Sequence, residues 1–140
     1  MGEETNDVVN IVRSDFNEKV MLNDNDVFVK FYASWCPHCA AMKSKWEELA
    51  HKFKKLNIGV VIAELDAPKN DIPGINIMSY PTFYLFRAGD KVNVLDFDGS
   101  VEVNAWDAFL AKYSPKYMEY LEDHPDEMPE ILKEPHEVDI

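Results

Sequence analysis

The chain has 140 residues, 46% of them apolar, which predicts one globular domain with a single core and no second folded domain. Its formal net charge of −12 argues against binding to nucleic acid or to an anionic membrane, because both surfaces would repel the protein. No run of about 18 apolar residues occurs and residues 1–25 lack the apolar stretch of a signal peptide, so we expect neither membrane insertion nor a secretion signal in this chain.

The first half of the chain alternates strand and helix patterns. A β-branched run at 8–12 predicts a strand, and residues 14–15 are suited to cap a helix over 16–22. The nearly continuous apolar run at 27–33 is typical of a strand that is buried on both faces. Apolar residues then recur at helical spacing over 37–56, which predicts one long amphipathic helix.

The second half predicts three more strands and a final helix. Residues 60–65 repeat the pattern of a buried strand, and 68–76 form a turn-rich connector with at most a short helix. Two strand patterns, at 81–86 and 92–97, flank a short Gly-Asp turn and are therefore expected to pair antiparallel. A helix that ends near Tyr113 completes the order βαβαβ(α)ββα. This order predicts an α/β fold with a central mixed β-sheet flanked by helices.

We place a boundary after the last predicted helix, which divides the chain into a folded domain at 1–113 and an acidic, proline-containing extension at 114–140. The extension holds nine acids against two lysines and four of the eight prolines. This composition predicts a mostly extended or disordered tail. Tyr117, Tyr120 and Leu121 are the residues suited to prolong the last helix by a turn or two.

The two cysteines are separated by two residues at the predicted junction of a strand and a helix. A sulfur at a helix N-terminus is favoured as the thiolate, so Cys36 is the predicted nucleophile. Cys39 lies one turn deeper, where it can attack a mixed disulfide at Cys36 and release the product. We therefore predict a redox-active disulfide between Cys36 and Cys39.

Two other interpretations of the pair are two unconnected core cysteines and half of a zinc site completed by His38, His51 or His124. Zinc usually needs four ligands at recognisable spacing, and no second Cys-x-x-Cys or His-x-His pair occurs. Trp35 immediately before the motif, the buried strand upstream and the long helix downstream favour the redox interpretation. We therefore predict chemistry without a metal and without an organic cofactor.

Residues 28–39, which end in Trp-Cys-Pro-His-Cys, together with Ser-Tyr-Pro-Thr-Phe at 79–83, resemble a catalytic domain of the protein disulfide isomerase family, within the thioredoxin superfamily. The resemblance covers about residues 8–113 and implies a thioredoxin fold. It also implies that Pro81 follows a cis peptide bond beside the cysteines, where the backbone of Tyr80 pairs with substrate peptide. From the residues alone, a trans proline at the start of an edge strand is the alternative.

The sequence departs from that family near the cysteines. The pair Pro37-His38 resembles the dipeptide of the bacterial periplasmic disulfide-donating oxidase, and His38 is a candidate for stabilising the Cys36 thiolate. The alternative is a solvent-facing His38 without an electrostatic role. Isomerase domains often carry Gly-x-Arg where this chain has residues 99–101, Gly-Ser-Val. Without that arginine, simple oxidation or reduction is better supported than efficient isomerisation.

Two central strands each carry one charge inside an apolar run, Lys30 and Glu64. Because a lone buried charge is costly, we expect the two side chains to face each other close to Cys39 and to serve its proton transfers. The resembling families have an acid at the first position and a lysine at the second, so this chain has the pair exchanged. A solvated or strand-end position for either residue is the alternative.

The predicted function is thiol–disulfide exchange, by an oxidoreductase or isomerase acting on unfolded or partly folded proteins that carry thiols or disulfides, with an unidentified redox partner. Trp35, Tyr80 and Pro81 form the predicted substrate-binding collar. We expect a domain of a secretory-pathway parent in the endoplasmic reticulum lumen. The alternatives are a cytosolic, thioredoxin-type disulfide reductant and a redox-inert thioredoxin-fold module that binds a client.

Overall fold

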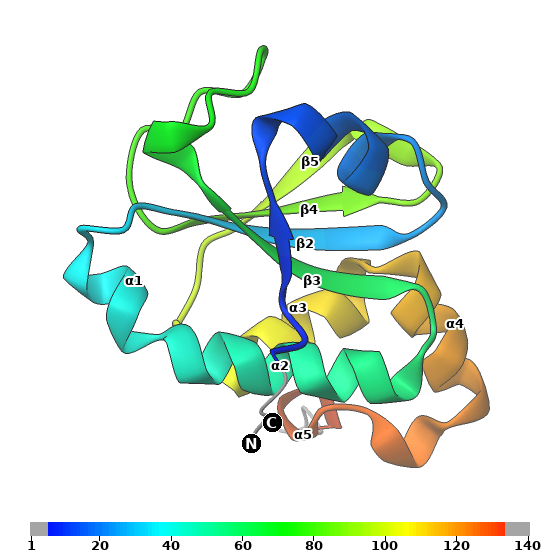
Figure 1. Cartoon of the computed structure of the whole chain (residues 1–140). Coiled ribbons are helices and arrows are strands. Elements are labelled where there is room, and N and C mark those ends of the chain that lie inside the picture. The colour runs from blue at the N-terminus through cyan, green and yellow to red at the C-terminus, as the bar shows by residue number, and fades with distance from the viewer. Residues whose placement is uncertain (1–5, 134–140) are drawn as a thin grey trace.

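Five strands form a mixed sheet in the order β1-β3-β2-β4-β5 (Figure 1). The computed structural model describes residues 6–133. Strands β1, β3 and β2 are parallel, β4 is antiparallel to β2, and β5 is antiparallel to β4. The strands are β1 (Val9–Ile11), β2 (Asp26–Tyr32), β3 (Val60–Asp66), β4 (Thr82–Arg87) and β5 (Asp90–Phe97).

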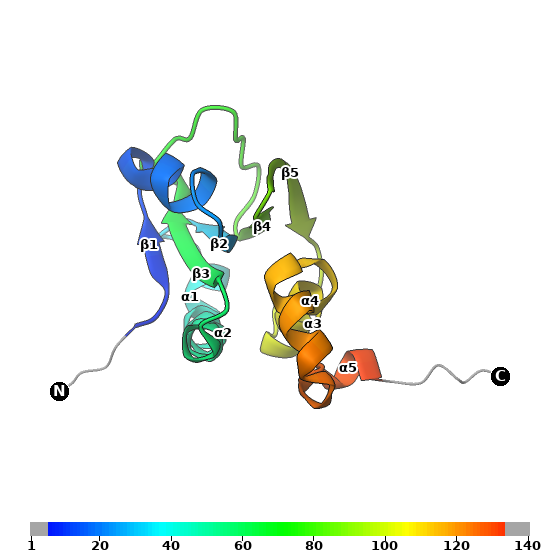
Figure 2. The same cartoon turned by 90° about the vertical axis from the view of Figure 1, so that its right-hand side faces the viewer.

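Helices and helical turns cover both faces of this sheet (Figure 2). On one side lie helices α2 and α3, and on the other lie the turns η1 and η2 with the connector between β3 and β4. The elements are η1 (Arg13–Asp15), η2 (Asn17–Met21), α1 (Pro37–Ala41), α2 (Lys43–Leu56), η3 (Ala67–Lys69), α3 (Val103–Tyr113), α4 (Pro115–Asp123), η4 (Pro125–Glu127) and α5 (Glu130–Lys133).

Strand β2 explains the two layers, because its alternate side chains point to opposite faces of the sheet. Phe28 packs against Trp46 of α2, with ring centroids 5.2 Å apart. Val27 and Val29 belong to the core on the other face. By the same alternation Lys30 falls on the α2 side. The predicted α/β fold with a mixed sheet is therefore confirmed, and its buried central strand carries a charge toward the long helix.

The predicted antiparallel pair of strands is a hairpin, β4–β5, closed by Ala88 and Gly89. Gly89 has a φ of +83°, in the left-handed region that favours glycine.

Two helix predictions need correction. The predicted helix over 37–56 is two helices, because Met42, with φ −99° and ψ 2°, ends α1 and precedes α2. Apolar periodicity does not reveal a break of one residue, since the apolar side chains before and after the break lie on the same side of the two helices. The predicted helix over 16–22 is a single π-helical turn, and Asp15 accepts a hydrogen bond from the N–H of Val12 at 2.8 Å.

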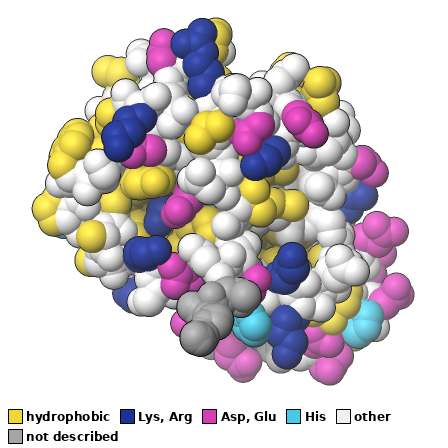
Figure 3. Space-filling model, viewed as in Figure 1, with side chains coloured by type: hydrophobic (Ala, Val, Ile, Leu, Met, Phe, Trp, Pro, Cys, Tyr) yellow, Lys and Arg dark blue, Asp and Glu magenta, His cyan; other side chains and the backbone are white. Residues whose placement is uncertain are grey.

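The prediction that the fold ends at residue 113 is wrong over 114–123. Helix α4 forms there, with Ser114 as its N-cap and Pro115 in its first turn. Tyr117 is 1% exposed, and its ring packs on that of Phe53 with centroids 4.8 Å apart. Acidic side chains gather over α4 and η4, at the lower right of Figure 3. Because this segment is so acidic, its composition did not reveal that one face of α4 is buried. Residues 134–140 of the predicted extension lie outside the described residues.

Asp26, at the start of β2, fastens the beginning of α4 to the sheet. Its carboxylate is buried and accepts hydrogen bonds from the Ser114 hydroxyl at 2.6 Å, the N–H of Lys116 at 2.9 Å and the N–H of Ala88 at 2.6 Å. One buried carboxylate thus joins the strand, the hairpin turn and the helix. Within residues 6–133, no helix has the length and apolarity that a membrane crossing requires.

Candidate active site

The two cysteines lie where β2 gives way to α1, and both are free thiols. Cys36 is the N-cap of α1, and its Sγ accepts a hydrogen bond from the N–H of Cys39 at 3.2 Å. Pro37 occupies the first turn, where its missing N–H costs nothing. Both cysteines are buried and cluster with Ala33. The structure thus brings the predicted dithiol pair together at the start of a helix.

The two cysteines are almost equally buried, with Cys36 5% and Cys39 4% exposed. Burial, together with the hydrogen bond to Cys36, raises the pKa of the Cys39 thiol to about 11. A backbone hydrogen bond at Ala33 and, as a smaller contribution, the positive charge of Lys30 oppose this rise. Cys39 therefore stays protonated near neutral pH until something assists its ionisation.

Lys30 and Glu64 face each other across the β2–β3 pairing, where they are register partners. The Nζ of Lys30 lies 3.5 Å from Oε1 of Glu64, and the two side chains are 3% and 19% exposed. Burial lowers the pKa of the Lys30 ammonium, and Glu64 opposes that shift. The ammonium also lies 5.6 and 5.8 Å from the ring centroids of Tyr32 and Trp46.

A hollow of about 200 Å³ connects this ion pair with the thiols. Lys30 and Glu64 line it together with Cys36 and Cys39. Such a space has room for water molecules and has polar partners for them. Both thiols and both charged side chains thus border the same space.

Tyr80 and Pro81 lie on another side of the nucleophile. The peptide bond between them is cis, as the family resemblance implied. The Sγ of Cys36 donates to the carbonyl oxygen of Tyr80 at 3.9 Å. Trp35 is 69% exposed, and its ring meets that of Tyr80 edge to face with centroids 5.6 Å apart. The three collar residues thus present an exposed aromatic surface and a backbone carbonyl beside the sulfur.

His38 is exposed and borders a hollow shared with Tyr80 and Pro81. Among the described residues, no hydrogen bond or ion pair joins its ring to Cys36. The proposed effect of His38 on the thiolate therefore stays a prediction.

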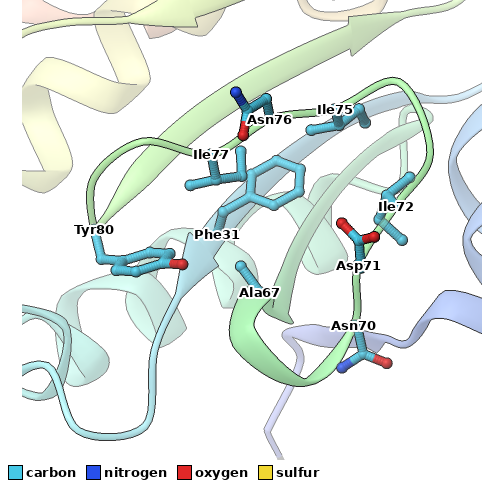
Figure 4. Close-up of a pocket in the computed structure, with 9 residues that line it drawn as sticks. All are labelled: Phe31, Ala67, Asn70, Asp71, Ile72, Ile75, Asn76, Ile77 and Tyr80. Carbon is cyan, nitrogen blue, oxygen red and sulfur yellow. The ribbon is translucent and has the colours of Figure 1, made fainter.

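Figure 4 shows Tyr80 at the end of a separate cavity of about 110 Å³, beneath the connector from β3 to β4. Its lining includes Phe31, Ile72 and Ile77 but no thiol, lysine or histidine. The cavity therefore lacks the groups that thiol chemistry needs.

Sequence reasoning missed two residues of the site, Tyr32 and Lys43, which line the hollow beside the thiols. Burial and the charges of Glu64 and Asp66 raise the pKa of the Tyr32 hydroxyl. Strand alternation is the signal by which Tyr32 could be found, because it follows Lys30 by two positions on β2 and therefore lies on the same face. Among the described residues, no group of three or more His, Cys, Asp or Glu side chains is arranged to hold a metal ion.

A pair of free thiols at the start of a helix, opposite a cis-proline and on a sheet of this order, defines a dithiol site of the thioredoxin fold. Comparison with known proteins agrees, because the thioredoxin family model matches residues 7–112. The chain belongs to the thioredoxin family.

The relatives are protein disulfide-isomerases, which confirms the predicted resemblance. Protein disulfide-isomerase 1 of Caenorhabditis elegans is 41% identical over 104 residues, 74% of this chain and 21% of the relative. Protein disulfide-isomerase A2 of Mus musculus is 38% identical over 103 residues, 74% of this chain and 19% of the relative. The chain therefore spans about a fifth of the length of the curated relatives it matches.

Among solved structures, the first thioredoxin domain of mouse protein disulfide-isomerase A4 matches with a TM-score of 0.65 and 26% identity. The match covers 99% of this chain and 87% of that domain.

Proposed function

We propose that the chain is a thiol–disulfide oxidoreductase or isomerase domain that acts on protein substrates through its Cys-Pro-His-Cys motif. One observation carries the proposal: the Cys36 sulfur lies between the N–H of Cys39 and the carbonyl oxygen of Tyr80, at the edge of an exposed aromatic surface. A substrate disulfide that binds at the Tyr80 carbonyl is therefore placed next to the Cys36 sulfur.

The exchange proceeds in two balanced steps. The Cys36 thiolate attacks one sulfur of a substrate disulfide, which forms a mixed disulfide and releases the other sulfur as a thiolate that takes up a proton. Cys39 then loses its proton and attacks the Cys36 sulfur, which forms the Cys36–Cys39 disulfide and releases the second substrate thiol. Two electrons pass from the protein dithiol to the substrate. The reverse sequence oxidises a substrate dithiol.

Lys30 and Glu64 assist the second step in this proposal. The ammonium of Lys30 favours the Cys39 thiolate, since it opposes the rise of the pKa of that thiol. Glu64 balances the charge of Lys30 and accepts the proton through the hollow that both line. In the resembling families the acid is on the first of the two strands and the lysine on the second. Because this chain has the two swapped, the lysine is on the central strand β2, beside the resolving thiol.

The proposed substrates are unfolded or partly folded proteins, because the collar of Trp35, Tyr80 and Pro81 offers apolar surface and a free carbonyl to an extended peptide. The relatives' name supports disulfides in proteins as the target. We infer a location in the endoplasmic reticulum lumen as part of a longer secretory protein, supported by the same relatives.

Reduction of insulin by dithiothreitol tests the proposal against a redox-inert client-binding module. The wild-type chain should accelerate the precipitation of the insulin B chain, and Cys36→Ser should not. A wild-type chain that fails to accelerate insulin reduction, both with dithiothreitol and at several ratios of reduced to oxidised glutathione, would favour the inert module.

The melting temperatures of the two redox forms separate an oxidant from a thioredoxin-type reductant. An oxidant has the less stable disulfide, because its dithiol form gains from the thiolate at Cys36. We expect reduction to raise the melting temperature. A more stable disulfide form would favour the cytosolic reductant.

A further inference from the structure

A second hollow, of about 390 Å³, opens beside the nucleophile on the side of the cis-proline. Met42 and Val101 give it an apolar lining, together with Pro81. His38 borders it as well. It is distinct from the hollow of Lys30 and Glu64, because the two share no lining residue.

An ion pair forms part of the wall of this hollow. The Nζ of Lys45 lies 3.2 and 3.1 Å from the two carboxylate oxygens of Glu102. Lys45 belongs to the first turn of α2, and Glu102 is the N-cap of α3, so the pair joins two elements that are 57 positions apart in the sequence. The side chains are 42% and 61% exposed.

The position of each partner also favours a paired state. A cation in the first turn of α2 lies at the positive end of that helix, which is unfavourable, whereas a carboxylate at the start of α3 is favourable. An unpaired Lys45 is therefore less favourable than an unpaired Glu102. While the two are paired, they add no net charge to the wall, and the apolar lining decides what fits.

We propose that the Lys45–Glu102 ion pair is a specificity-determining element of a side-chain subsite, which receives the substrate residue next to the attacked cysteine and prefers an apolar residue there. This inference rests on the proposed function. Since the sulfur of Cys36 lies at the Tyr80 carbonyl and Tyr80 also lines the hollow, a peptide seated on that carbonyl has a neighbouring side chain within reach of it.

Removal of either partner should leave a charge in the wall and change the preference in opposite directions. Glu102→Gln leaves the Lys45 ammonium, which attracts an acidic substrate residue and repels a basic one. Lys45→Met leaves the Glu102 carboxylate, which does the reverse. The expected change in relative rate is about threefold for each charged residue, in line with the small worth of exposed ion pairs.

The test is single-turnover reduction of short peptides whose cysteine carries a thiopyridine disulfide, with Leu, Glu or Lys as the adjacent residue on either side. Attack of Cys36 on the peptide sulfur releases thiopyridone, which is followed by absorbance, and Cys39 then releases the peptide thiol. Two electrons from the protein dithiol balance the reaction. The matched controls are Glu48→Gln and Lys55→Met, which make the same charge changes on exposed positions of α2 away from both hollows.

The wild-type chain should reduce the Leu peptide faster than the Glu and Lys peptides. Glu102→Gln should gain on the Glu peptide, and Lys45→Met on the Lys peptide, while the controls keep the wild-type order. Equal preferences in both variants and the wild type would overturn the inference. Hydroxyethyl disulfide, which is small and uncharged, separates the two levels, because failure to reduce it would refute the proposed function instead.

Discussion

Two lysines of this chain pair with carboxylates in quite different surroundings, one beside the thiols and one beneath helix α4. The ammonium of Lys52 lies 2.5 Å from Oδ2 of Asp107 and 3.0 Å from the hydroxyl of Tyr117. That hydroxyl in turn donates to Oδ1 of Asp107 at 2.7 Å. The three groups form a closed set. Lys30, by contrast, is almost fully buried and has Glu64, at 3.5 Å, as its ion-pair partner among the described residues.

The difference teaches what each pair does. A polar network in which every member is satisfied holds its elements together, and here it joins α2, α3 and α4. A buried lysine with one loosely placed carboxylate and a hollow beside it is costly to keep. Such a cost is expected where charges do chemistry, and this pair shares its hollow with the two thiols.

The largest effect should come from ending the chain after Tyr113, which removes Tyr117 from the closed set and Ser114 from Asp26. Loss of a buried aromatic side chain alone costs about 3–5 kcal/mol, a large part of the roughly 5–15 kcal/mol by which a domain is stable. We expect urea unfolding to lose its cooperativity. A chain that ends after Lys133 is the control and should unfold like the full chain, whereas cooperative unfolding of the 1–113 fragment would contradict the role of α4.

Glu64→Gln should have the next largest effect, because it leaves the Lys30 ammonium without its carboxylate. We expect a loss of about 3 kcal/mol in the free energy of unfolding, together with slower release of mixed disulfides. Urea unfolding and single-turnover kinetics measure the two effects. The double exchange Lys30→Glu with Glu64→Lys should be more stable than Lys30→Glu alone, and purely additive losses would refute the pairing.

Asp107→Asn should cost less, about 1–2 kcal/mol, since Tyr117 and Lys52 keep a neutral partner of the same shape. Insulin reduction should stay at the wild-type rate, because no member of this network lines the hollow beside the thiols. The pair of measurements sharpens the contrast with Glu64→Gln. A loss of turnover without a loss of stability would show that the two lysine pairs do not differ in kind.

The smallest effect concerns the ionisation of Cys39, whose pKa is raised to about 11. Below that pKa the thiolate fraction rises about tenfold per pH unit. Because Lys30 opposes the rise, Lys30→Met should move the pKa of Cys39 higher still, and Lys52→Met should leave it unchanged. Thiolate absorbance of the reduced protein, followed against pH, measures this. Equal titrations in the two variants would exclude an effect of Lys30 on Cys39.

Much of the fold and of the dithiol could be predicted from the sequence, because both depend on local pattern. The apolar run of β2 and the spacing of Cys36 and Cys39 leave few alternatives. The pairing of Lys30 with Glu64 followed from the cost of burying single charges. Helix α4 is predicted only as a prolongation of the last helix by a turn or two, because acids dominate its composition and the burial of Tyr117 depends on Phe53, 64 positions earlier in the chain. The break at Met42 leaves no trace in apolar periodicity.

The distinct roles of the two cysteines are tested most directly by trapping on a non-reducing gel. The substrate is a protein that has been unfolded, reduced and then reoxidised, so that it carries non-native disulfides. It is incubated with Cys39→Ser or with Cys36→Ser. We expect Cys39→Ser to accumulate mixed disulfides with substrate, because Cys36 still attacks and nothing resolves the product, while Cys36→Ser accumulates none. Mixed disulfides with Cys36→Ser and none with Cys39→Ser would contradict the assignment of Cys36 as the nucleophile.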